Sequence, residues 1–251
     1  WDLFNGSIAI TTSSGKLHIT PPNESAQYGN PMHFSLTFSI SDPMQIKWIN
    51  EKSLILWSRL KRRIAIVDID KKTITNLAPF KYLKDNDTII SQIIISPDRN
   101  HVCIVLNKQT AIIFRSQNME LVCMISLMEI AIGTFHSDSR SLIFIGFSHH
   151  LYIYDINGKL LSTQEFPKGL NNFPDNSPLP EPTAIMCNER GHVFVGDSLG
   201  EVFKFKKNFT SPKLIFPFKS DSVPTTVENE KDEGSIGLSA LANLFPFSKP
   251  S

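Results

Sequence analysis

The feature of this sequence that most constrains its fold is an internal repeat. Residues 90–125 and 130–165 align without a gap at an offset of 40, so that Asp98 falls on Asp138 and Phe114 on Tyr154. Each copy reads as four strands rich in Ile, Val and Phe, with short polar turns between them. A period of roughly 40–45 residues with four strands in each unit is typical of β-propeller blades. The sequence therefore predicts an all-β fold built from four-stranded blades.

The same pattern continues on both sides of these two copies. It recurs at offsets of about 47 residues upstream and about 50 residues downstream. The apolar runs that fit it are 8–10, 17–20, 46–48, 54–57, 64–67, 183–186, 193–195 and 202–205. Five blades are thus recognisable within residues 1–218, and the first of them lacks an opening strand. We expect an incomplete propeller that is a fragment or closes with strands from elsewhere.

Continuous apolar runs indicate how the blades pack. The runs 93–95 and 142–145 contain only apolar residues, without the alternation that a sheet with one wet face requires. We therefore expect the inner strands to be buried on both faces, between neighbouring blades.

Several strand ends carry a family resemblance. Asp155 and Asp68 end third strands, where degenerate WD repeats often place a Trp-Asp pair, and Asp197 stands in a similar turn. The chain resembles that family over about residues 7–218. It departs from the family where Arg115 and Lys206 replace the Asp, and no Gly-His dipeptide opens a blade. The resemblance implies a propeller that binds other protein subunits.

A narrower resemblance covers residues 182–205. This segment is similar to part of the non-catalytic WD subunit of the tRNA guanine-N7 methyltransferase family, which implies a scaffold that stabilises a catalytic partner on tRNA. A propeller of a ribosome-biogenesis complex and a propeller of a vesicle-tethering complex are the alternatives. The common prediction is a non-catalytic scaffold or adaptor subunit of an intracellular multiprotein or ribonucleoprotein complex.

Local charge is the source of any electrostatic binding, because 25 Lys and Arg residues balance 24 Asp and Glu residues. The densest basic cluster falls in the turn between the second and third strands of the second blade. Its members are Arg59, Lys61, Arg62 and Arg63. This basic turn is predicted to contact RNA phosphates or an acidic protein surface, and the alternative is an ordinary solvated hairpin turn. The Pro-rich insertion 167–182 belongs to the same rim, as a functional loop or an insertion without a role.

The residues after the blades differ in composition. Residues 219–234 are polar and acidic, which is typical of a flexible linker. Residues 235–251 are apolar again and suit one short helix that docks on the propeller or on a partner. The alternative is sequence without a docking role. The docking residues would be Leu238, Leu241, Leu244 and Phe245.

No residue pattern supports catalysis or cofactor binding. Cys103, Cys123 and Cys187 form no CxxC pair, which favours a reducing compartment over disulfides or zinc. Motifs for nucleotide binding, serine hydrolysis and zinc proteolysis are absent from the sequence. Asp98 and Asp138 are expected to cap their own turns. We therefore expect no catalytic residues, no metal, no cofactor and no small-molecule substrate.

Two further features bear on chemistry and location. The adjacent pair His149 and His150 is expected in a turn between strands, with too few companions for a metal site. The apolar runs are all much shorter than the ~20 residues that cross a bilayer. The expected location is intracellular, in the nucleus or the cytoplasm, without membrane insertion.

Overall fold

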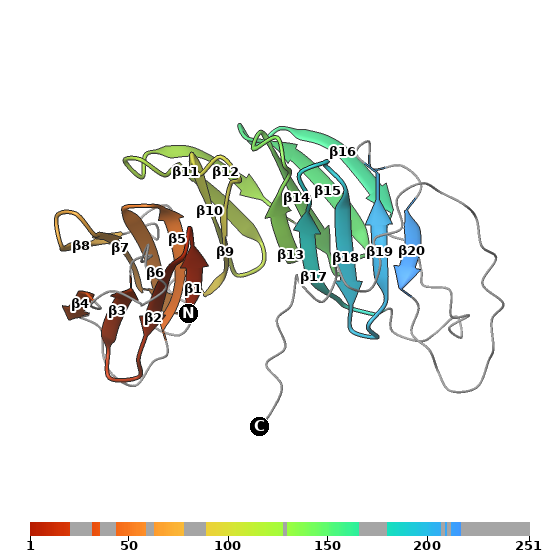
Figure 1. Ribbon diagram of the computed structural model, residues 1–251. Helices are drawn as coiled ribbons and strands as arrows, with labels where there is room; N and C mark the ends of the chain where they lie inside the picture. Colours follow the sequence, from red (N-terminus) through yellow and green to blue (C-terminus); the bar gives the residue numbers. More distant parts are fainter. Residues whose placement is uncertain are drawn as a thin grey trace, which may run out of the picture. The chain divides into compact units, whose positions relative to one another are not determined.

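The fold was determined from a computed structural model of the chain. It describes residues 1–20, 32–35, 44–58, 63–77, 89–127, 130–165, 180–206, 209 and 212–216, all within the unit Trp1–Phe218. These residues form five four-stranded antiparallel sheets (Figure 1). Within these ranges, no helix long and apolar enough to cross a membrane occurs.

Each sheet consists of four consecutive strands, and we number the sheets as blades 1 to 5. Blade 1 contains β1 (Asp2–Phe4), β2 (Ser7–Thr11), β3 (Lys16–Thr20) and β4 (Met32–Ser35). Blade 2 contains β5 (Met44–Asn50), β6 (Ser53–Ser58), β7 (Arg63–Asp68) and β8 (Thr73–Leu77). Blade 3 contains β9 (Ile90–Ile95), β10 (His101–Leu106), β11 (Thr110–Arg115) and β12 (Leu121–Ser126). Blade 4 contains β13 (Ile130–Phe135), β14 (Ser141–Gly146), β15 (His150–Asp155) and β16 (Leu160–Glu165). Blade 5 contains β17 (Pro182–Cys187), β18 (Val193–Asp197), β19 (Val202–Phe205) and β20 (Lys213–Phe216).

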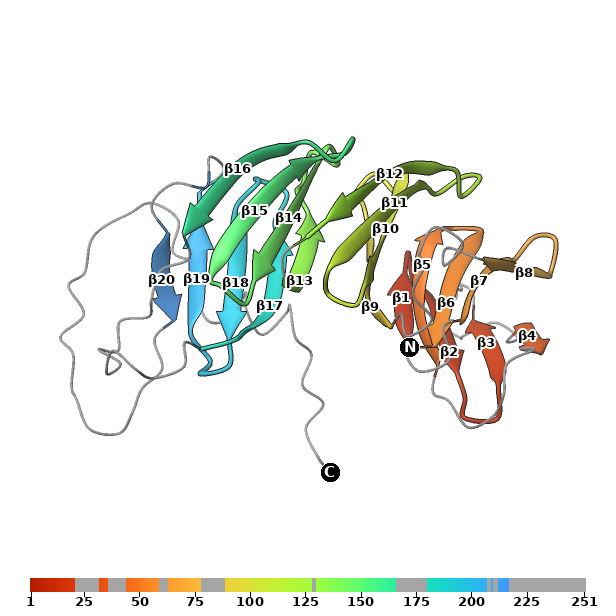
Figure 2. The same ribbon diagram turned by 180° about the vertical axis from the view of Figure 1, so that it is seen from behind.

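These strands confirm the repeat read from the sequence. The first three strands of blades 3 and 4 begin 40 residues apart, as the ungapped alignment requires. One expectation about blade 1 is wrong, because β1 supplies its opening strand and pairs with β2 through Leu3 and Ile8. The sequence did not reveal β1 because it spans three residues and its central side chain, Leu3, is exposed. In the part of the chain that the structure describes, the five blades do not close into a ring (Figures 1 and 2).

Burial of both sheet faces explains the continuous apolar runs. Successive side chains of a strand point to opposite faces, so one run can serve two interfaces. In β14, Leu142 and Phe144 pack against blade 3, whereas Ile143 and Ile145 pack against blade 5. All four side chains are fully buried.

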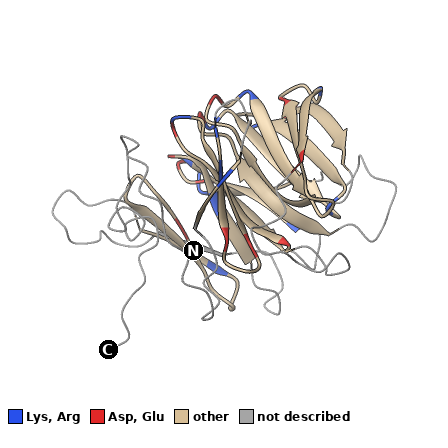
Figure 3. Cartoon of the chain, turned by 90° about the vertical axis from the view of Figure 1, so that its right-hand side faces the viewer, with Lys and Arg blue, Asp and Glu red and all other residues tan. Residues whose placement is uncertain are grey.

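The same division recurs in the second strands of blades 2 and 3. In β10, Val102 and Ile104 face blade 2, and Cys103 and Val105 face blade 4. The core therefore consists of four layers, one between each pair of neighbouring blades. In the described strands, charged residues stand at the first or last position, apart from Lys47 of β5 and Lys204 of β19. Many other charged residues lie in turns (Figure 3).

The expected burial on both faces is met more fully in the second strands than in the first strands. The first strands of neighbouring blades contact one another, as β9 does with β13 and β13 with β17, so they form the inner side. Yet Ile95 of β9 is half-buried, while the second strands β6, β10 and β14 are buried over five successive residues. The second strand has sheet neighbours on both edges and blades on both faces, whereas the first strand keeps one edge towards the inner side.

Asp98 and Asp138 cap their turns as predicted. The Asp98 carboxylate accepts hydrogen bonds from the Ser96 hydroxyl at 2.6 Å and from the Asn100 N–H at 3.0 Å. Asp138 accepts the N–H of Arg140 at 2.8 Å. The two turns also touch, because the N–H of Asp98 donates to Oγ of Ser139 at 2.9 Å.

A side-chain amide joins the first strands of blades 3 and 4. Gln92 of β9 donates from Nε2 to the Gly133 carbonyl and accepts the Gly133 N–H at Oε1, both at 2.9 Å. The amide thus satisfies both backbone groups of Gly133 that a neighbouring strand would otherwise pair. A β-carbon at Gly133 would collide with the Phe144 ring, so the close approach requires glycine.

Four charged or aromatic residues join blades 1, 2 and 3. The carboxylate of Asp2 accepts the Trp48 N–H at 2.7 Å, and the Trp48 indole donates to the Asp2 carbonyl at 3.3 Å. From the turn between β9 and β10, Nη1 of Arg99 donates to the Trp48 carbonyl at 2.7 Å. The Arg99 guanidinium also lies 4.4 Å from the centre of the Phe4 ring.

Burial keeps two of the cysteines unreactive. Cys103 lies fully buried in β10, and burial raises its thiol pKa far above the ordinary value. Burial also raises the pKa of Cys123 to about 11, with a smaller contribution from Asp155. Since the thiolate is the reactive form, neither residue is a nucleophile near neutral pH.

Substitution of Gly133 tests the joint between blades 3 and 4. Gly133→Ala is expected to destabilise the chain by about 1–3 kcal/mol, because the added methyl group overpacks against Phe144. Gly196→Ala is the matched control, since its β-carbon would stand 3.6 Å from Ala184, at ordinary contact distance. Urea unfolding followed by circular dichroism measures both. Equal midpoints for the two variants would contradict the steric argument.

Thiol labelling tests the cysteine environments. At pH 8 a thiol with a pKa of about 11 is ionised in roughly one molecule in a thousand, so Cys123 should react far more slowly than free cysteine. Cys103 should react more slowly still. Iodoacetamide labelling resolved by peptide mass spectrometry measures each site, and unfolding in guanidinium chloride should restore the ordinary rate at both.

Candidate functional site

The basic turn predicted from the sequence falls between β6 and β7. Ser58 at the end of β6 pairs with Arg63 at the start of β7, so the residues between them connect two paired strands. Arg63 is exposed. Arg59, Lys61 and Arg62 lie outside the described residues, and the binding role of the turn stays a prediction.

Other predicted interaction segments also lie outside the described ranges. They are residues 167–179 of the insertion, the linker 219–234 and the tail 235–251 with Leu238, Leu241, Leu244 and Phe245. The structure therefore neither supports nor opposes a docking role for them.

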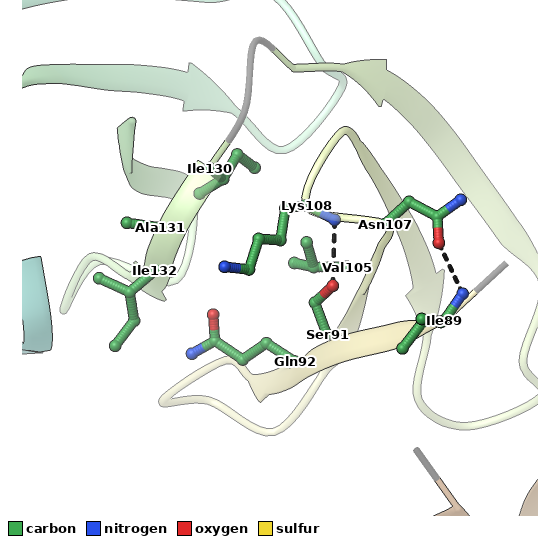
Figure 4. Close-up of a pocket in the computed structure, with 9 residues that line it drawn as sticks. All are labelled: Ile89, Ser91, Gln92, Val105, Asn107, Lys108, Ile130, Ala131 and Ile132. Atoms are coloured by element: carbon green, nitrogen blue, oxygen red, sulfur yellow. Dashed lines mark hydrogen bonds between the residues drawn. The ribbon is translucent and has the colours of Figure 1, made fainter. Parts of the chain in front are cut away.

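The structure reveals a hollow between the first strands of blades 3 and 4, which we call the rim pocket. It measures about 550 Å³ and opens where β9 and β13 begin (Figure 4). Its lining residues are Ile89, Ser91, Gln92, Val105, Asn107, Lys108, Ile130, Ala131 and Ile132. The turn between β10 and β11 forms one side. This is the turn that corresponds, one blade further on, to the predicted basic turn.

The turn that borders the rim pocket is held from two directions. Asn107 and Lys108 both adopt left-handed backbone conformations, with φ of 50° and 57°. Asn107 accepts the Ile89 N–H at its side-chain oxygen at 2.6 Å, and its own N–H donates to the Ile89 carbonyl at 2.8 Å. On the other side, the Ile130 N–H donates to the Lys108 carbonyl at 2.6 Å. The pocket therefore has a fixed border on both blades.

Apolar side chains form much of the pocket wall. Ile89 is 51% exposed, whereas Val105 and Ile130 are buried beneath the opening. Figure 4 shows Gln92 and Lys108 extending into the space between β9 and β13, opposite Ile132. The Lys108 ammonium also lies 4.4 Å from the centre of the Phe147 ring.

The polar groups of the pocket are mostly paired within the protein. The Gln92 amide is engaged by Gly133, and Oγ of Ser91 accepts the Lys108 N–H at 3.0 Å. Among the described residues that line the hollow, Lys108 carries the only formal charge. Such a site can bind an apolar side chain and orient a polar group beside it, but it offers no nucleophile with an adjacent base.

Ionisable residues elsewhere serve local structure. His149 occupies the turn before β15, as predicted, but His150 is the first residue of β15 and pairs with Glu165. Burial lowers the pKa of His149 against the opposing charge of Asp197. The pKa of Asp138 is lowered overall. Burial acts to raise it, but the hydrogen bond from the Arg140 N–H and the nearby His136, whose Nδ1 lies 3.0 Å away, outweigh that effect. No group of three or more His, Cys, Asp or Glu that could hold a metal occurs among the described residues.

Sequence reasoning missed the rim pocket because its walls belong to different blades. Ile89 and Ile132 lie far apart in the chain, and each reads as an ordinary apolar strand residue. One signal was available. Asn107 and Lys108 belong to the three-residue turn between β10 and β11, where Asn favours a left-handed backbone.

Two comparisons with known proteins gave no match. No protein-family model matches the chain. No curated protein matches it either.

Comparison with solved structures finds β-propellers. The Dos1 propeller matches with a TM-score of 0.62 and 11% identity, over 87% of this chain and 59% of that one. The selenomethionine-substituted virginiamycin B lyase of Staphylococcus aureus matches with a TM-score of 0.62 and 14% identity, over 86% of this chain and 68% of that one. This chain thus spans less than two thirds of the Dos1 propeller chain. At such low identity the likeness establishes the fold, which is a β-propeller, and leaves the function to be argued from the site.

Proposed function

We propose that this chain is a non-catalytic scaffold that docks protein partners on the rims of its propeller. The observation that carries the proposal is the rim pocket, an apolar hollow with a fixed border and internally paired polar groups. An apolar side chain of a partner would enter beside Ile132. Lys108 and Ile89 would then contact the surrounding partner surface.

The chemistry of the pocket favours binding over reaction. Interface energy usually concentrates where a few apolar or aromatic anchors fill a well-formed hollow with a polar border. The rim pocket offers such a hollow, in which the apolar side chains of Ile89 and Ile132 lie beside the polar side chain of Lys108. Because one structural neighbour is by name a lyase, the fold alone does not separate a scaffold from an enzyme, and the proposal rests on the pocket.

The setting of the scaffold is proposed from the sequence. We place it in an intracellular complex, in the nucleus or the cytoplasm, with other protein subunits as partners. Arg63 directly follows the turn between β6 and β7, and Lys108 lies in the equivalent turn of blade 3. These two cations on the same rim could contact RNA phosphates. The second candidate is therefore an RNA-associated subunit of a tRNA-modifying or ribosome-biogenesis complex. A role in vesicle tethering would depend on the tail and has no support in the described residues.

Substitution at the pocket opening tests the scaffold. Ile89→Asp is expected to reduce recovery of at least one stoichiometric partner by about tenfold or more, because it places a charge on the apolar edge of the interface. Met124→Asp is the matched control, since Met124 is similarly exposed, at 41%, but lies on the outer strand β12. Affinity purification of the full chain with quantitative mass spectrometry provides the measurement.

Three outcomes separate the candidates. Loss of a protein partner with Ile89→Asp alone supports docking at the rim pocket. Loss of crosslinked RNA with Lys108→Glu, while protein partners stay, supports the RNA-associated role. A purified monomer that turns over a small molecule would overturn the scaffold proposal.

A further inference from the structure

A second hollow lies at the opposite ends of the first strands, and we call it the axial pocket. Its volume is about 290 Å³, and it is lined by residues from the first strand of every blade. Those that matter here are Asp2, Lys47, Ile95, Thr134 and Cys187, together with Arg99 from the turn after β9. The axial pocket thus brings together side chains that lie far apart in the sequence.

The charged residues of the axial pocket are two cations and one anion. Asp2 is partly committed, since its carboxylate accepts the Trp48 N–H at 2.7 Å. It forms no ion pair with Lys47 or Arg99 within 4.0 Å in the described structure. The lining therefore carries an excess of one positive charge that no close carboxylate neutralises.

Arg99 is fixed in place but retains donors. Its Nη1 donates to the Trp48 carbonyl at 2.7 Å, and its guanidinium stacks over the Phe4 ring. A guanidinium has five N–H donors in a rigid plane, and the described structure records one of its nitrogens in use. Arg99 is therefore a preorganised cation with donors to spare.

Lys47 is half-buried, and its ammonium group forms no hydrogen bond or ion pair with the described residues. Burial lowers its pKa, Arg99 lowers it further, and Asp2 acts in the opposite direction. A partly desolvated cation beside a second cation is unfavourable, and an anion between them would relieve both costs.

We propose that the axial pocket binds a small anionic group, a phosphate or a carboxylate, between the Lys47 ammonium and the unused N–H groups of Arg99. The volume fits a compact anion, because pockets for drug-sized ligands begin at roughly 300 Å³. Phosphate and carboxylate both carry negatively charged oxygens that accept hydrogen bonds from a guanidinium and an ammonium group. This site is independent of the rim pocket and goes beyond the scaffold function.

Anion titration tests the proposal with inorganic phosphate and malonate as probes. Isothermal titration calorimetry of the full chain, at ionic strength held constant with sodium chloride, should show saturable binding of at least one probe. Lys47→Met should weaken that binding by about tenfold or more, because a hydrogen bond between charged groups is lost. Lys47→Arg should retain binding. Lys16→Met, at an exposed position of β3, is the matched control and should bind as the wild-type chain does.

A second measurement on the unmodified chain removes any dependence on the folding of the variants. The bound probe should protect Lys47 from acetylation by an activated ester, while Lys16 is acetylated at an unchanged rate. Stronger binding of phosphate supports a phosphorylated ligand, and stronger binding of malonate supports a carboxylate ligand. Absence of binding by both probes, equal binding by Lys47→Met, or acetylation of Lys47 that ignores the probes would each overturn the proposal.

Discussion

The structure depends on the burial of both faces of each inner blade. A four-stranded sheet with two apolar faces cannot be stable alone in water, so each blade needs a neighbour on either side. The alternation within β14 shows this requirement directly, since Phe144 packs against blade 3 and Ile143 packs against blade 5. Because the layers between blades hold the apolar side chains, most charged side chains of the described strands stand at the strand ends.

The two pockets lie at opposite ends of the same inner strands and differ in chemistry. The rim pocket is bordered by apolar residues such as Ile89 and Ile132, and its polar groups are paired internally. In the axial pocket, Lys47 and Arg99 keep unused donors beside a partly committed Asp2. The lining of the rim pocket is thus largely apolar, whereas the lining of the axial pocket carries a net positive charge.

Much of the fold could be predicted from the sequence, because a blade is a local unit. The period, the hairpin positions and the capping roles of Asp98 and Asp138 depend on residues close together in the chain, and the structure confirms them. The pockets could not be predicted in this way. Lys47 and Arg99 meet only because two blades pack together, and neither residue belongs to a motif. The strand β1 was not predicted for a different reason: its three residues are too few to show the alternation of apolar and polar side chains that marks a strand.

Arg99 gives the stack of blades a property that a simple repeat protein lacks. When each unit touches only the next, stability is a sum of unit and nearest-neighbour contributions, and the ends can unravel separately. Arg99 extends from blade 3 to the Trp48 carbonyl of blade 2 and to the Phe4 ring of blade 1. It therefore adds a coupling between units that are not adjacent. The first three blades should open as one cooperative block, while blades 4 and 5 retain the freedom of an ordinary linear array.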